Sequence, residues 1–233
     1  MGAAGRLAME HLSLLSDYTP PSNPLTDVRF EFVDLDGELV ACWRERFADV
    51  PAVTARQGSI LEVQTDAIVS PANSFGFMDG GLDLALSMHF GWQMEANVRR
   101  ALLEEHDGEL PVGLAIVVPT EHGQVPWLVS APTMRVPMVV KDTANAHLAF
   151  RAILRAVRAH NLSRPDSPIG SVACPGLGTG NGMMPPDRCA RQMREAYEVC
   201  VHGRLLRKGR LAAAARQHMA MIDYDPDARG GRS

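Results

Sequence analysis

The sequence predicts an α/β protein: a three-layer α/β/α fold whose central sheet is mixed and mostly parallel. Short apolar segments alternate along the chain with longer segments whose apolar residues recur at helical spacing. One of the short segments, within "DAIVSPAN", is continuously apolar, which is typical of a strand buried on both faces of a sheet. Hydrophobic residues make up 46% of the 233 residues, which is enough for one sizeable core. We therefore expect a single domain.

The first half of the domain is expected to contain three strands and an interrupted helical region. "VRFEFV" (28–33) alternates polar and apolar residues, as a half-buried strand does, and "DGELVACWRERF" (36–47) has the apolar spacing of a helix. Residues 52–60 and 66–73 are expected to be strands. Residues 82–106 show helical periodicity, which a glycine near the middle interrupts.

The second half continues the alternation. Strands are expected at 113–120 and 127–134, before the clearest amphipathic helix of the chain at 143–160, whose first residue is a threonine suited to an N-cap. A strand at 169–176 leads through a glycine-rich loop into a helix at 185–200. That helix starts with prolines, which do no harm there because the first helical N–H groups have no partner within the helix.

The two ends of the chain are expected to lie outside the domain. Residues 1–27 are expected to be an N-terminal extension, because the prolines of "TPPSNP" disfavour helix. The domain itself is expected at 28–203, and 204–233 are expected to form a basic helix and a flexible tail. We interpret the basic residues of that segment as a solvated helix face.

Composition and charge exclude several classes of function. A formal net charge of −4 argues against a protein that mainly coats nucleic acid or an anionic membrane, so nucleic acid is not the favoured partner. No window approaches the ~20 apolar residues that a membrane helix needs. The four cysteines show neither a CxxC pair nor the spacing of a zinc site. We expect a cytoplasmic protein with reduced thiols, no membrane partner and no metal or other cofactor.

The glycine-rich loop "CPGLGTGNGMMPP" has the character of an anion site. Gly176, Gly178, Gly180 and Gly182 alternate, so the backbone can turn tightly and direct successive N–H groups to one point before a helix, which suits phosphate. The loop is not a Walker motif, because no Gly-Lys-Ser/Thr follows, and it is not the dinucleotide GxGxxG, because Met183 stands where the third glycine would be. A glycine-rich turn without a ligand is the alternative.

A second unusual loop, "SPANSFGFMDGGLD", follows the strand at 66–73. Asn73 carries both a donor and an acceptor for a sugar hydroxyl, and Gly80 and Gly81 let the backbone approach a ligand closely. Asp83 falls in the first turn of the next helix, where it could cap the helix or could orient or deprotonate a water. Since ligands in open α/β sheets bind at the carboxyl ends of the strands, both loops are expected to meet there.

In order and position, the two loops resemble the ligand loops of the macrodomain, an ADP-ribose-binding α/β/α family, over residues 28–200. "DAIVSPAN" is similar to the family's "DAIVNAAN". The resemblance implies that Asn73 contacts the distal ribose and that Gly80, Gly81 and Asp83 lie beside the scissile bond. The residues expected to hold the diphosphate are Gly178, Thr179, Gly180, Asn181 and Gly182, and Met183 beside them is also expected to contact the ligand.

The chain also departs from the family pattern. At the adenine end, where many members have the Asp of "GDI", it has Ser59 followed by Ile60, and we expect this pair to contact the base. Ser70 replaces the family's first strand-end Asn, and Ser87 stands where the MacroD-type hydrolases have a His. His89, two positions further on, falls on another helix face.

The resemblance implies an ADP-ribosyl hydrolase that releases ADP-ribose from a modified protein or small molecule, with Asp83 and Gly81 as the catalytic positions. A glycosidic bond at the anomeric carbon of ribose breaks through an oxocarbenium-like state, which a nearby carboxylate and an in-line water assist. One alternative is a reader module that binds ADP-ribose or a related nucleotide without hydrolysis. Another is a pocket retuned for a different nucleotide or a nucleic-acid end.

Overall fold

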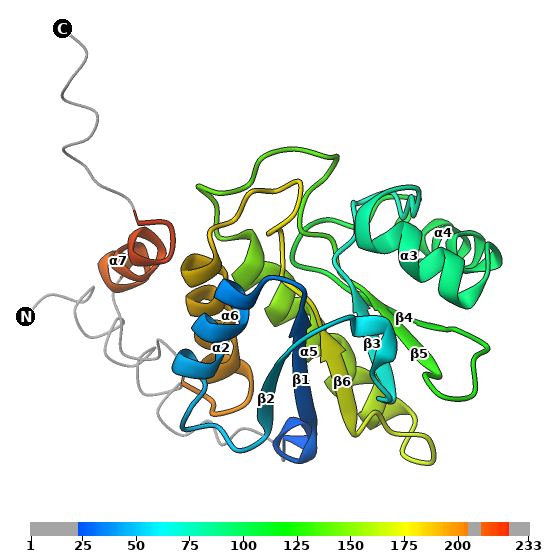
Figure 1. Cartoon of the computed structure of the whole chain (residues 1–233), viewed down its shortest axis with the longest axis horizontal. Coiled ribbons are helices and arrows are strands. Elements are labelled where there is room, and N and C mark those ends of the chain that lie inside the picture. Colours follow the sequence, from blue (N-terminus) through cyan, green and yellow to red (C-terminus); the bar gives the residue numbers. More distant parts are fainter. Residues whose placement is uncertain (1–22, 205–210, 224–233) are drawn as a thin grey trace, which may run out of the picture.

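The structure is a computed structural model that describes residues 23–204 and 211–223 (Figure 1). Most of the expected N-terminal extension lies outside the described residues, as do most of the basic cluster at 204–210 and the expected C-terminal tail. Within the described residues, no helix has both the length and the apolar character needed to cross a membrane.

The core of the fold is a six-stranded sheet with the order β2-β1-β6-β3-β5-β4. Its neighbouring strands pair in parallel except β4 and β5, which are antiparallel, so the prediction of a mixed, mostly parallel sheet is confirmed. The strands are β1 (Arg29–Asp34), β2 (Val53–Gln57), β3 (Ala67–Ser70), β4 (Ile116–Pro119), β5 (Trp127–Ser130) and β6 (Ser171–Cys174).

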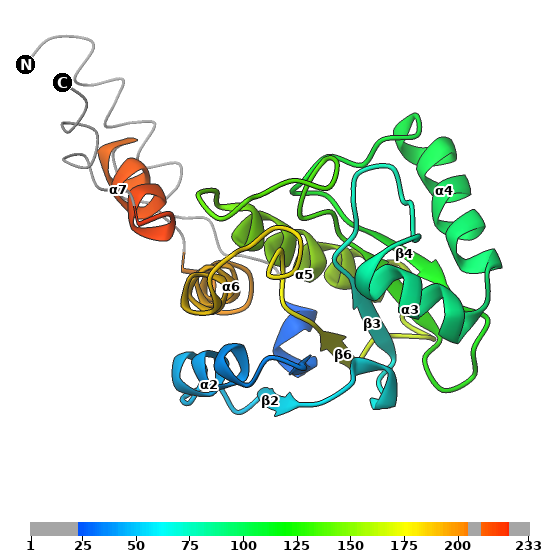
Figure 2. The ribbon, with the colours of Figure 1, turned by 45° about the horizontal axis from the view of Figure 1, so that its top comes forward.

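Helices cover both faces of the sheet, which gives the three layers that the sequence predicts. One hydrophobic core joins the sheet to α2, α5 and α6, and the other joins it to α3 and α4. Figure 2 shows α2 beside α6 and α3 beside α4. The helices are α2 (Gly37–Arg46), α3 (Gly81–Phe90), α4 (Gln93–His106), α5 (Asn145–Ser163), α6 (Pro186–Cys200) and α7 (Leu211–Met221), with short 3₁₀ turns η1 (Pro24–Asp27) and η2 (Ile60–Glu62).

The central strand β3 shows why its sequence is continuously apolar. All four of its residues are buried, because helices cover both faces of the sheet at this point. Ala67 and Val69 pack into the core with α5 and α6, whereas Ile68 packs into the core with α3 and α4. Alternate side chains of one strand therefore contribute to both cores.

One local prediction is confirmed and another needs a small change. The helical region at 82–106 divides at Gly91, whose φ of +98° is one that residues with a Cβ rarely adopt. The N-cap position of α5 is Ala144 rather than Thr143. The Thr143 hydroxyl nevertheless accepts a hydrogen bond from the Asn145 N–H at 3.2 Å, so the threonine still serves the first turn of the helix.

The sheet order determines where the unusual loops lie. β3 and β6 are adjacent and parallel, so the loops that follow them start at the same edge of the sheet. We call residues 71–80, between β3 and α3, the first loop, and residues 175–185, between β6 and α6, the second loop. The third loop, residues 131–144, follows β5, which is the other neighbour of β3.

Candidate functional site

A cavity of about 440 Å³ opens at the carboxyl ends of the strands, where the sequence predicts the ligand site. The end of β1, the first, second and third loops and the first turn of α3 all contribute to its wall. The loops singled out in the sequence therefore meet around one space, as predicted.

The second loop curls tightly on its own backbone. The Met184 N–H donates to the Gly178 carbonyl at 2.9 Å, and the Met183 N–H donates to the Gly180 carbonyl at 2.9 Å. A Cβ on Gly182 would lie 2.3 Å from the Gly178 carbonyl oxygen, so the curl requires glycine there. Gly180 differs, because a Cβ at this position would meet no heavy atom within 4 Å. The wall of the cavity is therefore open beside Gly180.

All five residues expected to hold a diphosphate line the cavity: Gly178, Thr179, Gly180, Asn181 and Gly182. Met183 is not among the lining residues, and its side chain is 61% exposed. The next residue, Met184, is buried in the core beneath the loop. The described lining residues include Asp34, Asp79 and Asp83 but no lysine or arginine, so an anion in this cavity would rely on backbone N–H groups.

Asp34, which the sequence reasoning did not single out, anchors the second loop. It is the last residue of β1, and its Oδ2 accepts a hydrogen bond from the Gly176 N–H at 3.0 Å. Its Oδ1 accepts the Asp36 N–H at 3.0 Å. A carboxylate at the end of a strand was a visible signal, but its partner could be identified only once β1 was known to lie beside β6.

Asn73 lines the cavity, but its carboxamide is engaged within the first loop. Its Nδ2 donates to the Phe77 carbonyl at 2.7 Å, and its Oδ1 accepts the N–H groups of Phe75 at 3.0 Å and Phe77 at 3.3 Å. These bonds fix the shape of the loop. A ribose hydroxyl would therefore have to share this side chain with the backbone of the loop.

Gly80 and Gly81 leave the cavity open on the side of the first loop. A Cβ on either residue would meet no heavy atom within 4 Å. Gly81 has a φ of +57°, a left-handed conformation that favours glycine. Glycine at these positions thus provides free space beside the N-terminus of α3.

Asp83 is a buried carboxylate at the wall of this cavity, with 9% of its surface exposed. The Ser70 hydroxyl, at the end of β3, donates to its Oδ1 at 2.6 Å. Burial raises the pKa of Asp83 from 3.8 to about 6; the bond from Ser70 opposes the rise, and the charge of Asp79 adds to it. Among the described residues, no backbone N–H donates to this carboxylate, so its hydrogen bonding does not support a role as a helix cap.

The unusual pKa predicts the effect of Asp83 on stability. Because the folded-state pKa is raised, the folded protein binds the proton more tightly, and the free energy of unfolding falls as the pH rises from 3.8 to about 6. At pH 8 the ionised carboxylate destabilises the fold by about 3 kcal/mol. Asp83→Asn retains an acceptor for Ser70, so we expect the variant to be more stable than the wild type by about 1–3 kcal/mol at pH 8 in urea denaturation. If Asp83 were a helix cap, the variant would gain no stability, because asparagine caps nearly as well as aspartate and only the favourable interaction of the charge with the helix dipole would be lost.

Ser59 and Ile60 lie at a neighbouring cavity of about 310 Å³. This second cavity shares Asp34, Leu35, Gly81, Leu82 and Pro175 with the first. The Ser59 hydroxyl accepts the Leu61 N–H at 3.3 Å and caps η2. The expected base contact is therefore adjacent to the main cavity, and it adjoins the first turn of α3.

Neither Ser87 nor His89 lines the main cavity. Ser87 is fully buried, and its hydroxyl donates to the Met78 carbonyl at 3.4 Å. The His89 ring packs against Phe90 and His122. Among residues 23–204 and 211–223, no group of three or more His, Cys, Asp or Glu side chains could hold a metal ion.

Comparisons with known proteins agree with this geometry. The Macro domain family model matches residues 69–193. An uncharacterised protein of Aquifex aeolicus is 33% identical over 139 residues, which are 60% of this chain and 76% of that protein.

Two solved structures are also similar. The macrodomain of Mycobacterium tuberculosis DarG is 25% identical with a TM-score of 0.51, over 60% of this chain and 86% of that one. A mutant Oceanobacillus iheyensis macrodomain, solved with ADPR, is 17% identical with a TM-score of 0.49, over 59% of this chain and 74% of that one.

Proposed function

Because this chain belongs to the macrodomain family, an ADP-ribose-binding family, we propose that it binds ADP-ribose and hydrolyses an ADP-ribosyl linkage. The products are ADP-ribose and the released protein or small molecule. The observation that carries the proposal is the buried carboxylate of Asp83 at the wall of the cavity, with a pKa of about 6. Such a group exchanges a proton near neutral pH, which suits a general base.

Binding would be shared among the walls of the two cavities. The curled second loop, which leads to the N-terminus of α6, offers N–H groups to the diphosphate. The open space at Gly80 and Gly81 accommodates the distal ribose, and the cavity at Ser59 and Ile60 accommodates the base. No cofactor takes part in this account.

In the proposed reaction, Asp83 activates water against the anomeric carbon. Above pH 6 its carboxylate is ionised and can accept a proton as the water oxygen bonds to that carbon. The bond from the anomeric carbon to the leaving group breaks, its electron pair stays with the leaving group, and the oxocarbenium-like state collapses to ADP-ribose. Because Ser70 holds Oδ1, the second carboxylate oxygen is the one that receives the proton.

A reader module is the second candidate function, and one observation favours it. The described residues that line the main cavity include no histidine, lysine or arginine that could protonate a leaving group. A protein that only binds ADP-ribose needs no such acid. The two functions share the ligand and differ in turnover.

Calorimetry with ADP-ribose, together with chromatography of products from ADP-ribosylated protein, tests the proposal. We expect saturable binding and release of free ADP-ribose. Binding without release would identify a reader. If no binding occurs at millimolar ligand, both functions fail.

Ser70 offers a test of how Asp83 is held. Its hydrogen bond lowers the pKa of Asp83, so Ser70→Ala should raise that pKa further. If the ionised form is the active one, the acidic limb of the rate profile should move to higher pH, and activity should recover at pH 8.5. Ser70→Thr, which keeps the hydroxyl, should restore the wild-type profile. An unchanged limb in Ser70→Ala would contradict this role.

A further inference from the structure

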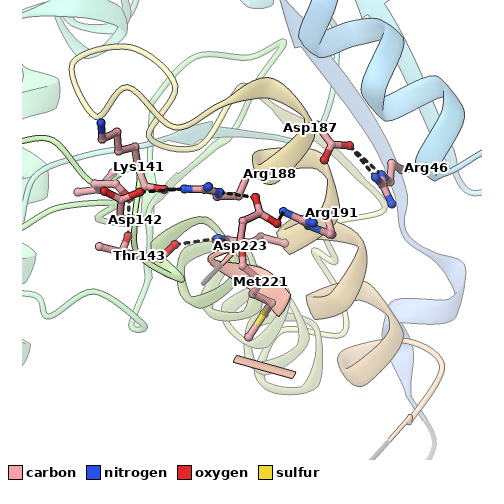
Figure 3. Close-up of polar contacts among 11 residues, drawn as sticks. Arg46, Lys141, Asp142, Thr143, Asp187, Arg188, Arg191, Met221 and Asp223 are labelled. Carbon is pink, nitrogen blue, oxygen red and sulfur yellow. Dashed lines mark hydrogen bonds and ion pairs between the residues drawn. The ribbon is translucent and has the colours of Figure 1, made fainter. Parts of the chain in front are cut away.

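We propose that the C-terminal end of α7 is a clamp that holds the second loop in its ligand-binding shape. The clamp consists of Asp223, whose partners are Arg188 and Arg191 of α6 (Figure 3). It also includes the Met221 carbonyl, whose partner is Gln192 of α6. These residues lie outside the main cavity, so the role is one of positioning rather than contact with the ligand. The inference rests on the proposed binding of ADP-ribose.

Asp223 makes the first half of the clamp. Its carboxylate lies 2.9 Å from Nε of Arg188 and 2.6 Å from a terminal nitrogen of Arg191, one turn apart along α6. Arg188 is only 13% exposed and Arg191 is 26% exposed. The Asp223 carboxylate is itself 46% exposed, so water screens part of the attraction, and it is the simultaneous contact with two guanidinium groups that holds its geometry.

Gln192 makes the second half. It is fully buried, and its Nε2 donates to the Met221 carbonyl at 3.0 Å and to the Thr143 carbonyl at 2.8 Å. Its Oε1 accepts the His147 N–H at 3.1 Å. One side chain thus ties the end of α7 to the third loop and to the start of α5. Without α7, one of its amide hydrogens would lose its partner.

The third loop transmits this anchoring to the second loop. Arg188 donates to the Lys141 carbonyl and lies 3.2 Å from the Asp142 carboxylate (Figure 3). The preceding residue, Val140, donates its N–H to the Gly182 carbonyl at 2.8 Å. The Val140 side chain also packs beneath the curl, because its Cγ2 would be 2.7 Å from a Cβ on Gly182. A continuous series of contacts therefore leads from Asp223 to the residues expected to hold the diphosphate.

The clamp should improve binding by restricting the second loop before the ligand arrives. An anion held by backbone N–H groups requires those groups to point to one place, and ordering a loop on binding reduces affinity. α7 lies outside the residues 69–193 that match the family model.

Asp223→Ala is the direct test, and Asp49→Ala is its matched control. Asp49 also pairs with an arginine of α6, at 2.5 Å from Arg194, and its loss removes the same charge. Neither Asp49 nor Arg194 contacts the second or third loop among the described bonds. We expect Asp223→Ala to raise the Kd for ADP-ribose about threefold to tenfold in calorimetry, with the control within a factor of two of wild type.

The direction in which the Kd changes in Asp223→Ala distinguishes the clamp from a purely electrostatic effect of Asp223. Removing a carboxylate near the site of an anionic ligand should by itself strengthen binding. The clamp predicts weaker binding in Asp223→Ala, and a milder loss in Asp223→Asn, which can keep one bond to an arginine. A Kd equal to or below that of wild type would overturn the proposal.

Amide hydrogen exchange provides a readout that needs no ligand. Exchange of the Val140 N–H, which bonds to Gly182, should be faster in Asp223→Ala than in wild type or Asp49→Ala. An unchanged rate would overturn the clamp even if the wild type binds ADP-ribose. If the wild type does not bind ADP-ribose, the proposed function fails, while faster exchange would still support the mechanical link between α7 and the second loop.

Discussion

Replacing Asp83 with asparagine is expected to reduce the rate of ADP-ribose release at pH 8 by about 10²- to 10⁴-fold, the usual contribution of a general base. Asparagine has nearly the same shape and still accepts the bond from Ser70, so the cavity should be preserved. It cannot accept a proton from water. Affinity for ADP-ribose should be equal to or higher than that of wild type, because a negative charge near the diphosphate is lost.

The control for this variant is Asp166→Asn, which changes an exposed carboxylate in the connection between α5 and β6, away from the cavity. It should have wild-type turnover. If Asp83→Asn retains the wild-type rate, Asp83 is not the base and the assignment is wrong. If instead both turnover and binding are lost, the side chain supports the site structurally.

Replacing Gly180 with valine is expected to weaken ADP-ribose binding by about a hundredfold or more, a loss of roughly 3 kcal/mol. A Cβ at Gly180 meets no heavy atom within 4 Å, so valine should be accommodated without distorting the protein. The added side chain would, however, project from the wall of the cavity where the diphosphate is expected. Calorimetry measures the loss, and urea denaturation checks that stability is unchanged.

Gly123→Val is a matched control for that experiment. Gly123 lies between β4 and β5, and a Cβ there would also meet no heavy atom within 4 Å. This variant should bind ADP-ribose as the wild type does. Wild-type affinity in Gly180→Val would show that the second loop does not hold the diphosphate.

The sequence was sufficient to predict the class of fold and the edge of the sheet that carries the cavity. Both depend on local patterns in the sequence. These are the apolar run of the strand expected at 66–73, the helical spacing after it, and the clustered glycines of the two loops, which indicate tight turns. The position of β6 between β1 and β3 is a property of the whole fold. For that reason the bond between Asp34 and Gly176 could not be predicted, although each residue is visible in the sequence.

In the candidate site, too, local sequence identified candidate residues, whereas their roles depend on contacts that only the fold shows. The resemblance selected Asp83, but its alternative role as a helix cap could be weighed only once its burial and its bond to Ser70 were known. The pattern also suggested Asn73 as a sugar contact, whereas its carboxamide already bonds to the backbone of its own loop. The interpretation of 204–233 as a basic helix and tail gave no sign that Asp223 pairs with α6, because partners distant in sequence leave no local signal.

The most direct test of the central claim is a hydrolysis assay of the full chain across ADP-ribose linkages to acidic residues, arginine, serine and nucleic-acid ends. We predict that the wild type releases ADP-ribose from at least one of these linkages and that Asp83→Asn does not. Binding of ADP-ribose without release from any of the four would contradict the claim and leave a reader module.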